Sequence, residues 1–374
     1  MVLLEFSLNG LFWRRRLNKA TVFQLYTEHH GKVSDKWSLY LTEYDRLFKD
    51  YHDKPVSLLE IGIQNGGSLE IWSKYFINAQ KLVGCDINPA CASLSYEDGR
   101  ISIVVGDANS DSSESEILGY SPTFDLIIDD GSHHSGDIVK TFMRYFPHLQ
   151  DEGIFVIEDL HCSYWQEYGG GLSYPFSSIS FFKYLIDIVN QEHWGIEKTS
   201  INILDSFFSE YGYKIDDEFL THIHSVEFIN SMCVIKKSKQ KHNILGTQFI
   251  AGLTETIVPG HLVLHSKYGV TPDQSGNNWT KHEFFKIKEL AESEERIATL
   301  IQSMAERDEQ IENLTQSIGE RDGQIENLTQ SIVERDGQIK NLSQTITSYQ
   351  NSRSWRITKP LRVISEYLKK ITMT

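Results

Sequence analysis

The sequence predicts an α/β fold with a doubly wound sheet, parallel except for a terminal antiparallel strand, followed by a long C-terminal coiled-coil helix. Between residues 55 and 160, short apolar runs alternate with helix-like stretches: VSLLEIG, KLVGCDI, ISIVVGD, FDLIIDD and GIFVIED. Runs of this length that end in glycine or an acid are typical of buried parallel strands. From about residue 290, isoleucine recurs every seven residues, which is the pattern of a coiled coil.

Composition shifts along the chain predict five segments. An N-terminal helical segment is expected over residues 1–50 and an α/β domain over residues 51–240. In this domain IHSVEFIN and SMCVIKK should form the antiparallel pair at the edge of the sheet. A connector with modest structure follows over residues 241–288, then the coiled coil over residues 289–350 and a basic amphipathic tail over residues 351–374.

The coiled-coil segment repeats a fourteen-residue unit three times: ERDEQIENLTQSIG, ERDGQIENLTQSIV and ERDGQIKNLSQTIT. Isoleucine takes the a position of each heptad, and leucine takes alternate d positions. The other d positions hold Arg307, Arg321 and Arg335, which can pair across to a glutamate and fix the register. We expect a homo-oligomer through this segment, the alternative being a single solvated helix.

The charge and cysteine content narrow the classes of function. The net charge of −15 argues against general nucleic-acid binding, which depends on clustered Lys and Arg. Four cysteines without a CxxC pair imply neither a zinc site nor a disulfide framework, and we expect a cytoplasmic protein. The basic tail predicts peripheral contact with the inner face of the membrane, unless its apolar side packs on the protein itself.

The segment LLEIGIQNGGSLEIW reads as a strand, a glycine-rich turn and the start of a helix. A dinucleotide fingerprint would need glycine where Gln64 stands, which argues against NAD or FAD. The pattern ExGxxxGxS instead fits the turn that binds S-adenosyl-L-methionine. It gives these candidate cofactor-binding residues: Glu60, Gly62, Asn65, Gly66 and Ser68.

Two further acids end the next strands on the same edge of the sheet. Asp86 lies 24 residues after Gly62, where a carboxylate accepts the hydroxyls of a ribose. Asp107 ends the third strand, close to where an adenine would lie. The alternative is a plain α/β fold whose turns contain glycine and whose aspartates cap helices.

The segments FDLIIDDGSHH and IFVIEDL each end a buried strand in two carboxylates. If the two strands are neighbours, their terminal acids converge at one crevice: Asp129, Asp130, Glu158 and Asp159. Carboxylates that meet in this way repel unless they are protonated or hold a cation, and oxygen ligands favour Mg²⁺ or Mn²⁺. His133 or His134 could serve as a base beside this site. The alternative is helix-capping acids next to a surface pair of histidines.

These motifs together resemble the metal-dependent macrolide-sugar O-methyltransferases of the mycinamicin and macrocin type, and more distantly the cephalosporin-hydroxylase-like family. The resemblance covers roughly residues 30–240 and implies the Rossmann-like sheet of a class I methyltransferase. By its motifs it implies that Asp130, Glu158 and Asp159 bind Mg²⁺ and that His133 is the base. Asp129 would support the site from its strand, as a further candidate cofactor-binding residue. The segment SDKW, with Asp35 and Lys36, also resembles a family segment and would help to close the pocket.

The resulting prediction is a methyltransferase that depends on S-adenosylmethionine and a divalent metal. Its acceptor would be a sugar hydroxyl of a glycan or a glycosylated metabolite. The coiled coil and the basic tail would suit modification of a surface polysaccharide near a membrane. Two alternatives stay open from the sequence: a methyltransferase that acts on a non-sugar diol, and a non-catalytic scaffold that displays a degenerate domain on a coiled coil.

Overall fold

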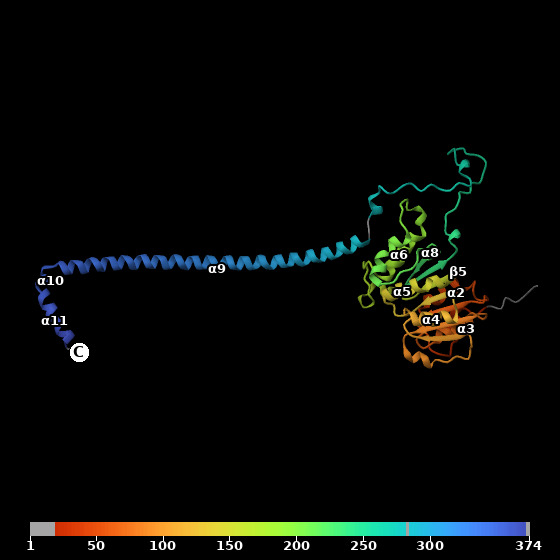
Figure 1. Cartoon of the computed structure of the whole chain (residues 1–374), viewed down its shortest axis with the longest axis horizontal. Coiled ribbons are helices and arrows are strands. Elements are labelled where there is room, and N and C mark those ends of the chain that lie inside the picture. The colour runs from red at the N-terminus through yellow and green to blue at the C-terminus, as the bar shows by residue number, and fades with distance from the viewer. Residues whose placement is uncertain (1–18, 282–283, 372–374) are drawn as a thin grey trace, which may run out of the picture. The chain divides into compact units, whose positions relative to one another are not determined.

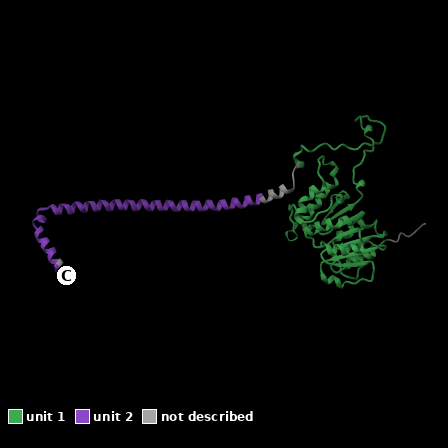
Figure 2. Ribbon diagram, in the orientation of Figure 1, with its two compact units in different colours: residues 1–289 green, residues 290–374 purple. Residues whose placement is uncertain are grey.

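A computed structural model describes residues 19–281 and 284–371 of the chain. The chain divides into two compact units, Met1–Glu289 and Leu290–Thr374 (Figure 2). The first eighteen residues of the predicted N-terminal helical segment lie outside the described residues. The first unit contains the sheet, and the second consists of helix alone.

A seven-stranded sheet forms the centre of the first unit, in the order β3-β2-β1-β4-β5-β7-β6. Strands β1 to β5 run parallel to one another, whereas β7 is antiparallel to both β5 and β6. The strands are β1 (Ser57–Ile61), β2 (Lys81–Asp86), β3 (Ile101–Val105), β4 (Phe124–Asp129), β5 (Leu149–Ile157), β6 (Ile223–Ile229) and β7 (Met232–Lys237). The predicted parallel sheet with an antiparallel pair at its edge is confirmed.

The strands are apolar on both faces because helices cover both faces. Alternate residues of β5 enter different cores: Ile154 and Val156 pack on one side, Phe155 and Ile157 on the other. Successive side chains of a strand point to opposite faces of the sheet. A strand that is buried on both faces therefore needs a continuous apolar run. This explains why the five apolar runs in the sequence do not alternate with polar residues.

Helices of the first unit are short, and half of the eight in its described part begin at a capping side chain. Ser110 and Ser177 accept from backbone N–H groups in the first turns of α4 and α6, and Thr21 and Thr199 form capping boxes at α1 and α7. The helices are α1 (Val22–Thr27), α2 (Ser38–Phe48), α3 (Gly67–Tyr75), α4 (Asp111–Tyr120), α5 (Ser135–Tyr145), α6 (Ser178–Val189), α7 (Ser200–Tyr211) and α8 (Asp217–Leu220).

Helix α2 is fixed to α3 by an aromatic cluster. The ring of Trp72 on α3 lies 5.1 Å from Tyr44 and 5.9 Å from Phe48, both in edge-on geometry. All three rings are fully buried, and edge-to-face contacts of this kind stabilise a core beyond the burial of area. The cluster therefore holds α2, and the segment that precedes it, against the edge where the parallel strands end.

The second unit is one long helix followed by two short ones. Figure 1 shows α9 (Phe284–Asn351) as a single continuous helix, followed by α10 (Arg353–Ile357) and α11 (Lys359–Ile371). The heptad pattern thus lies on one unbroken helix, as its periodicity predicts. None of the helices in the described part of the chain has both the length and the apolarity needed to cross a bilayer.

Candidate functional site

The turn between β1 and α3 brings the backbone close to the end of β4. Gly62 has φ +83°, and a Cβ atom on it would lie 2.0 Å from the carbonyl oxygen of Asp130. Gly66 has φ +78°, and a Cβ atom there would lie 2.1 Å from the Tyr96 hydroxyl. Both positions require glycine, because other residues rarely adopt this backbone and would not fit. The turn is thus packed tightly beneath the carboxyl edge of the sheet.

Asp86 holds this turn from the end of β2. Its Oδ2 atom accepts from the backbone N–H groups of Ile63 at 3.0 Å and Gln64 at 2.8 Å. Its Oδ1 atom accepts from the N–H group of Asn88 at 2.8 Å. The carboxylate still lines the cavity at this edge of the sheet, so it is placed to accept hydroxyl groups of a ligand there.

Only some of the candidate cofactor-binding residues line the cavity. Gly62, Ser68 and Asp86 line the cavity, whereas Asn65, Gly66 and Asp107 are not among its lining residues. Glu60 is fully buried and accepts from the Ser68 hydroxyl at 2.6 Å. Burial raises the pKa of Glu60, against the lowering effect of the nearby Lys36 ammonium.

The cavity has a volume of about 510 Å³ and lies where β1, β4 and β5 end. One wall is the segment Val33–Trp37, which precedes α2. The cavity is also lined by the turn after β1, the residues that follow β4, and Glu158 and Asp159 after β5. A ligand held by the turn would therefore face the acidic residues predicted to bind metal. This is the crevice at which open α/β sheets bind their ligands.

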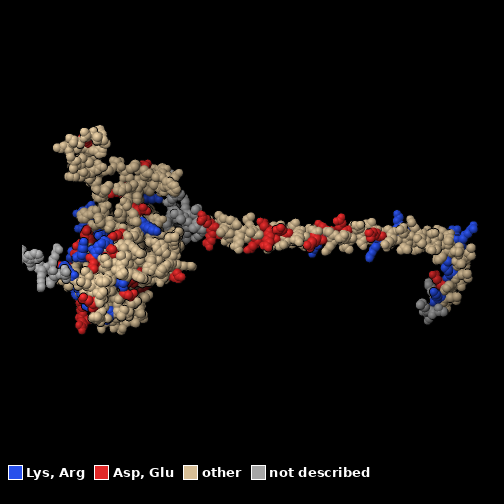
Figure 3. Space-filling view, turned by 180° about the vertical axis from the view of Figure 1, so that it is seen from behind, with Lys and Arg blue, Asp and Glu red and all other residues tan. Residues whose placement is uncertain are grey.

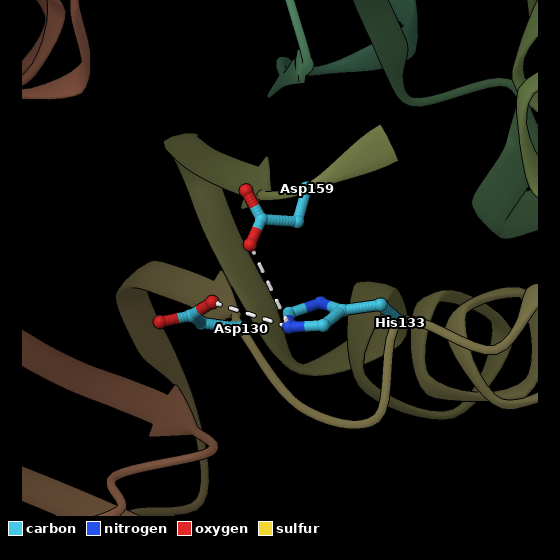
Figure 4. Close-up of side chains that lie close together, drawn as sticks. All are labelled: Asp130, His133 and Asp159. Atoms are coloured by element: carbon cyan, nitrogen blue, oxygen red, sulfur yellow. Dashed lines mark ion pairs between the residues drawn. The ribbon is translucent and has the colours of Figure 1, made fainter. Parts of the chain in front are cut away.

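Three of the predicted site residues meet at one point of this cavity. His133 Nε2 lies 3.9 Å from Asp130 Oδ1 and 3.7 Å from Asp159 Oδ2 (Figure 4). One ligand atom from each residue falls within 4.8 Å of the other two. The two carboxylates supply the oxygen ligands that suit Mg²⁺ or Mn²⁺, with the imidazole beside them. The residues present therefore fit a divalent cation.

The backbone at this point is strained in a way that aims the side chains. His133 has φ +58° and Asp159 has φ +52°, and both values lie in the left-handed region that non-glycine residues seldom adopt. Such residues cluster at functional sites, where the surrounding structure holds them in place. His134, the alternative base, lies apart from the cluster, and its ring contacts Tyr168 at 5.4 Å.

Glu158 faces a different set of partners from Asp159. Its buried carboxylate accepts from the Tyr44 hydroxyl and lies 2.7 Å from Lys36 Nζ. Burial and the neighbouring Asp130 raise the pKa of Glu158 to about 8, although Lys36 and Tyr44 act in the opposite direction. The ligand atoms that lie close enough together to hold one cation belong to Asp130, His133 and Asp159, and Glu158 is not part of this group.

Lys36 connects the two groups of acids. Its Nζ atom lies 2.5 Å from Asp130 Oδ2 and 3.7 Å from Glu60 Oε1, and the side chain is only 2% exposed. Burial alone would lower the pKa of Lys36, but the carboxylates of Glu158, Asp130 and Glu60 together raise it well above its usual value. Lys36 is therefore a buried ammonium that neutralises carboxylates at the floor of the cavity.

Aromatic residues around α2 hold Asp159, and these contacts were not predicted from the sequence. Trp37 Nε1 donates to Asp159 Oδ1 at 3.0 Å, and the Tyr40 hydroxyl donates to the same oxygen at 2.9 Å. Tyr40 and Tyr44 are four residues apart, so they share one face of α2. This spacing of two tyrosines, directly after the SDKW segment, is the feature of the sequence from which these contacts could have been predicted.

Asp129 supports the site from inside the sheet. Its Oδ1 atom accepts from the Gly131 N–H group at 3.3 Å, and its Oδ2 atom has no hydrogen-bond partner among the described residues. Burial raises the pKa of Asp129 to about 8, despite this hydrogen bond. The neutral acid is therefore the favoured form near pH 7, which relieves the repulsion with Asp130.

A second cavity of about 430 Å³ adjoins the first through Trp37, which lines both. His161 lies between two tryptophans, with its ring 6.2 Å from Trp37 and 4.9 Å from Trp165. The indoles are 61% and 48% exposed, respectively. Exposed aromatic residues around a cavity are typical of ligand sites. This cavity also contains the polar residues Asn230 and Ser231.

Comparison with known proteins identifies methyltransferases as relatives of part of the chain. No family model matches it. Demethylmacrocin O-methyltransferase of Streptomyces fradiae is 34% identical over 195 residues, covering 46% of this chain and 48% of that protein. The 8-demethyl-8-alpha-L-rhamnosyl tetracenomycin-C 2'-O-methyltransferase of Streptomyces olivaceus is 33% identical over 168 residues, covering 42% and 43%. The chain thus spans about half the length of the curated relatives it matches.

A solved structure supports the assignment of the fold. The methyltransferase MycE of the mycinamycin biosynthetic pathway, in complex with Mg and SAH, matches with a TM-score of 0.50 at 24% identity. The match covers 66% of this chain and 58% of MycE. The first unit therefore has the Rossmann-like fold of a class I methyltransferase, and the resemblance to O-methyltransferases of the macrocin and mycinamicin type is confirmed.

Proposed function

We propose that the first unit is a methyltransferase that uses S-adenosylmethionine and a divalent metal to methylate a sugar hydroxyl. One observation carries this proposal: Asp130, His133 and Asp159 meet in the same cavity as Asp86 and the glycine turn. A site for the methyl donor and a site for the acceptor hydroxyl would thus share one cavity. Proximity of this kind is a large part of the catalysis of group transfer.

The donor would be held by the turn after β1 and by Asp86. S-adenosylmethionine supplies an electrophilic methyl group when it is bound. Gly62 allows the ligand to approach the backbone, and Asp86 accepts hydroxyl groups of the ribose while it keeps Ile63 and Gln64 in place. MycE, whose fold this unit shares, was solved with SAH, which supports this assignment.

The acceptor would be activated by the cluster at the end of β4 and β5. Asp130 and Asp159 would hold Mg²⁺ or Mn²⁺, which lowers the pKa of a hydroxyl that contacts it. His133 Nε2 faces the space between the two carboxylates, where it would accept the proton of that hydroxyl. Glu158 remains a predicted ligand, and it would have to exchange Lys36 for the metal.

The aromatic cavity next to the cluster supports a sugar as the acceptor. The faces of a pyranose ring are apolar and its edges are polar, so a sugar fits a site with indole walls and a polar rim. Trp37 joins this cavity to Asp159 through its indole N–H group. One of the relatives is named for a rhamnosyl group, which favours a sugar over a non-sugar diol.

The decisive experiment is methyl transfer to a panel of glycans and glycosides, followed by mass spectrometry for the gain of one methyl group. Transfer should be lost with EDTA and restored by Mg²⁺ or Mn²⁺. The His133→Ala variant should lose at least about a hundredfold in rate. The matched control is His134→Ala, which should retain most of the activity.

Binding of Mn²⁺ separates two roles for His133. If the imidazole is the base, His133→Ala keeps its affinity for Mn²⁺ while it loses methyl transfer. If the imidazole is instead a ligand, both are lost together. A non-catalytic scaffold would show no heat of binding with S-adenosylmethionine in calorimetry, and that result would refute the proposed function altogether.

The second unit would assemble the enzyme and locate it. We expect homo-oligomerisation through α9, whose apolar positions face solvent in the single chain. Basic side chains gather near the end of this unit, over α10 and α11, whereas acidic side chains dominate the earlier part of α9 (Figure 3). The tail would contact an anionic membrane, in a cytoplasmic enzyme that modifies polysaccharide. If deletion of residues 351–374 left the membrane fractionation of the protein unchanged, this proposed contact would be wrong.

A further inference from the structure

Helix α9 presents a continuous apolar stripe that has no cover in the described part of the chain. The a positions are Ile297, Met304, Ile311, Ile318, Ile325, Ile332, Ile339 and Ile346, and the apolar d positions are Leu300, Leu314, Leu328 and Leu342. Each of these side chains is between 54% and 65% exposed. A stripe of this length gains stability only when another surface covers it.

The stripe is interrupted at regular intervals by charge. Arg307, Arg321 and Arg335 occupy the d positions between the leucines. Each is followed at the e position by an aspartate: Asp308, Asp322 and Asp336. None of these arginines forms an ion pair within the described residues. The chain thus repeats an unpaired Arg–Asp step every fourteen residues along the face that it exposes.

We infer that α9 pairs with α9 of a second copy as a parallel, in-register, two-stranded coiled coil. Isoleucine at a with leucine at d favours two strands over three or four. In a parallel pair the d side chain packs beside the d and e residues of the same heptad on the other helix. Arg321 then lies next to Asp322 of the partner subunit, and Asp322 lies next to Arg321 of the partner subunit.

The arginine layers select this arrangement against its competitors. A shift by one heptad would put each arginine beside a leucine and an uncharged e residue, and each aspartate beside a leucine. The uncharged e residues are Ile301, Thr315, Thr329 and Ser343. An antiparallel pair would bring the two e edges together, where an aspartate faces only aspartate, threonine or serine over residues 308–343. Polar residues in a heptad core cost stability but fix register and partner number. Here they favour the parallel, unshifted pair.

The glycines of the repeat agree with this packing. Gly323 and Gly337 occupy f positions and Gly319 occupies a b position, all on the outer side of the pair. A Cβ atom at any of the three would meet nothing within 4 Å. Glycine weakens a helix in isolation, so contacts along the a and d stripe are what hold α9 in one piece.

Parallel pairing has a consequence for the tail. Both copies of α10 and α11 follow the same end of the coiled coil, so their basic residues are presented in duplicate. Two linked copies bind a common surface more tightly than one, because the second contact becomes intramolecular. The pairing is independent of the proposed methyl transfer, and an inactive enzyme would still pair in this way.

The oligomeric state and orientation of the full-length chain test the inference. Sedimentation equilibrium should give twice the chain mass of 43.0 kDa. The Ile346→Cys variant, at an a position near the end of the stripe, should form a disulfide-linked dimer under mild oxidation. Ser348→Cys is the matched control, because its c position faces outward. A monomer, a trimer, or equal cross-linking at the two positions would overturn the inference.

Two triple variants, each of which replaces three carboxylates by amides of the same shape, test the role of the arginine layers. Replacing the three e-position acids (D308N, D322N, D336N) removes the cross-pairs and should weaken the dimer by about tenfold. The control replaces the acids that precede the arginines at outward c positions (E306Q, E320Q, E334Q) and changes the net charge equally. If the control weakens the dimer as much as the test variant, the pairing of arginine with aspartate is wrong.

Discussion

Lys36 Nζ lies 2.7 Å from Glu158 Oε1 at the floor of the cavity, and both side chains are 2% exposed. The same ammonium lies 2.5 Å from Asp130 Oδ2. A buried charge in this position is held by its partners and not by water. Lys36 therefore links the segment before α2 to the ends of both β4 and β5.

Replacement of Lys36 by methionine should destabilise the metal-free protein by about 3 kcal/mol, because it leaves Glu158 and Glu60 buried without a cation. Mn²⁺ should then raise the melting temperature of the variant more than that of the original protein, since the metal supplies the missing positive charge. Thermal unfolding with and without Mn²⁺ measures both effects. Lys32→Met is the control, because Lys32 pairs with a partly exposed Glu70. An equal response to Mn²⁺ in K36M and the original protein would contradict this role.

Gly62→Ala should disrupt the turn and the acidic cluster together. The added Cβ atom would lie 2.0 Å from the Asp130 carbonyl oxygen, at a φ of +83°, so we expect a loss of about 3 kcal/mol in the free energy of unfolding. Gly212→Ala is the matched control. Gly212 also has a positive φ, +67°, but meets nothing within 4 Å, and should cost about 1 kcal/mol. Chemical denaturation compares the two, and similar losses would show that the close approach is unimportant.

Asp86→Asn should weaken the binding of S-adenosylhomocysteine by about tenfold or more, because a charged acceptor of hydroxyl groups is lost. Binding of Mn²⁺ should not change, since Asp86 is not part of the cation cluster. Calorimetry with each ligand measures the two affinities. Asp125→Asn provides a control at the opposite end of the strands, where Asp125 accepts from the Ser57 N–H group at 2.8 Å. Loss of both ligands in D86N would indicate a general collapse of the site.

Lys237 should make stability depend on pH above neutrality. Its buried ammonium donates to the carbonyl oxygens of Phe146, Pro147 and Leu149, yet burial lowers its pKa to about 8 from 10.5. Between pH 8 and 10.5 the unfolded chain binds more protons than the folded chain, so stability rises with pH across this window. Below pH 8 the cost of the buried charge is fully present.

The Lys237→Met variant isolates this effect, because methionine does not titrate. The melting temperature of the original protein relative to K237M should rise between pH 7.5 and pH 10. Lys236→Met is the control, at the preceding, exposed position of β7. The difference in melting temperature between the original protein and K236M should not change with pH over this range. A constant difference between K237M and the original protein across this range would mean that the three carbonyl acceptors compensate for burial.

The acids of the site were predictable because their positions depend on local pattern. Apolar runs that end in Asp or Glu place those residues at the carboxyl edge of a parallel sheet, whatever the rest of the chain does. Asp86, Asp130 and Asp159 all line the cavity at this edge. The heptads of α9 are equally local, so the helix could be read from its period alone.

Which of these side chains meet depends on the folded chain. The periodicity of neighbouring residues was enough to predict the strands, their terminal acids and the long helix. It did not determine that His133 joins Asp130 and Asp159 while Glu158 turns to Lys36 and Tyr44. The direction of these side chains depends on left-handed backbone at His133 and Asp159 and on the packing of α2 against Trp72. Both arise from contacts between residues far apart in the chain, which no local period encodes.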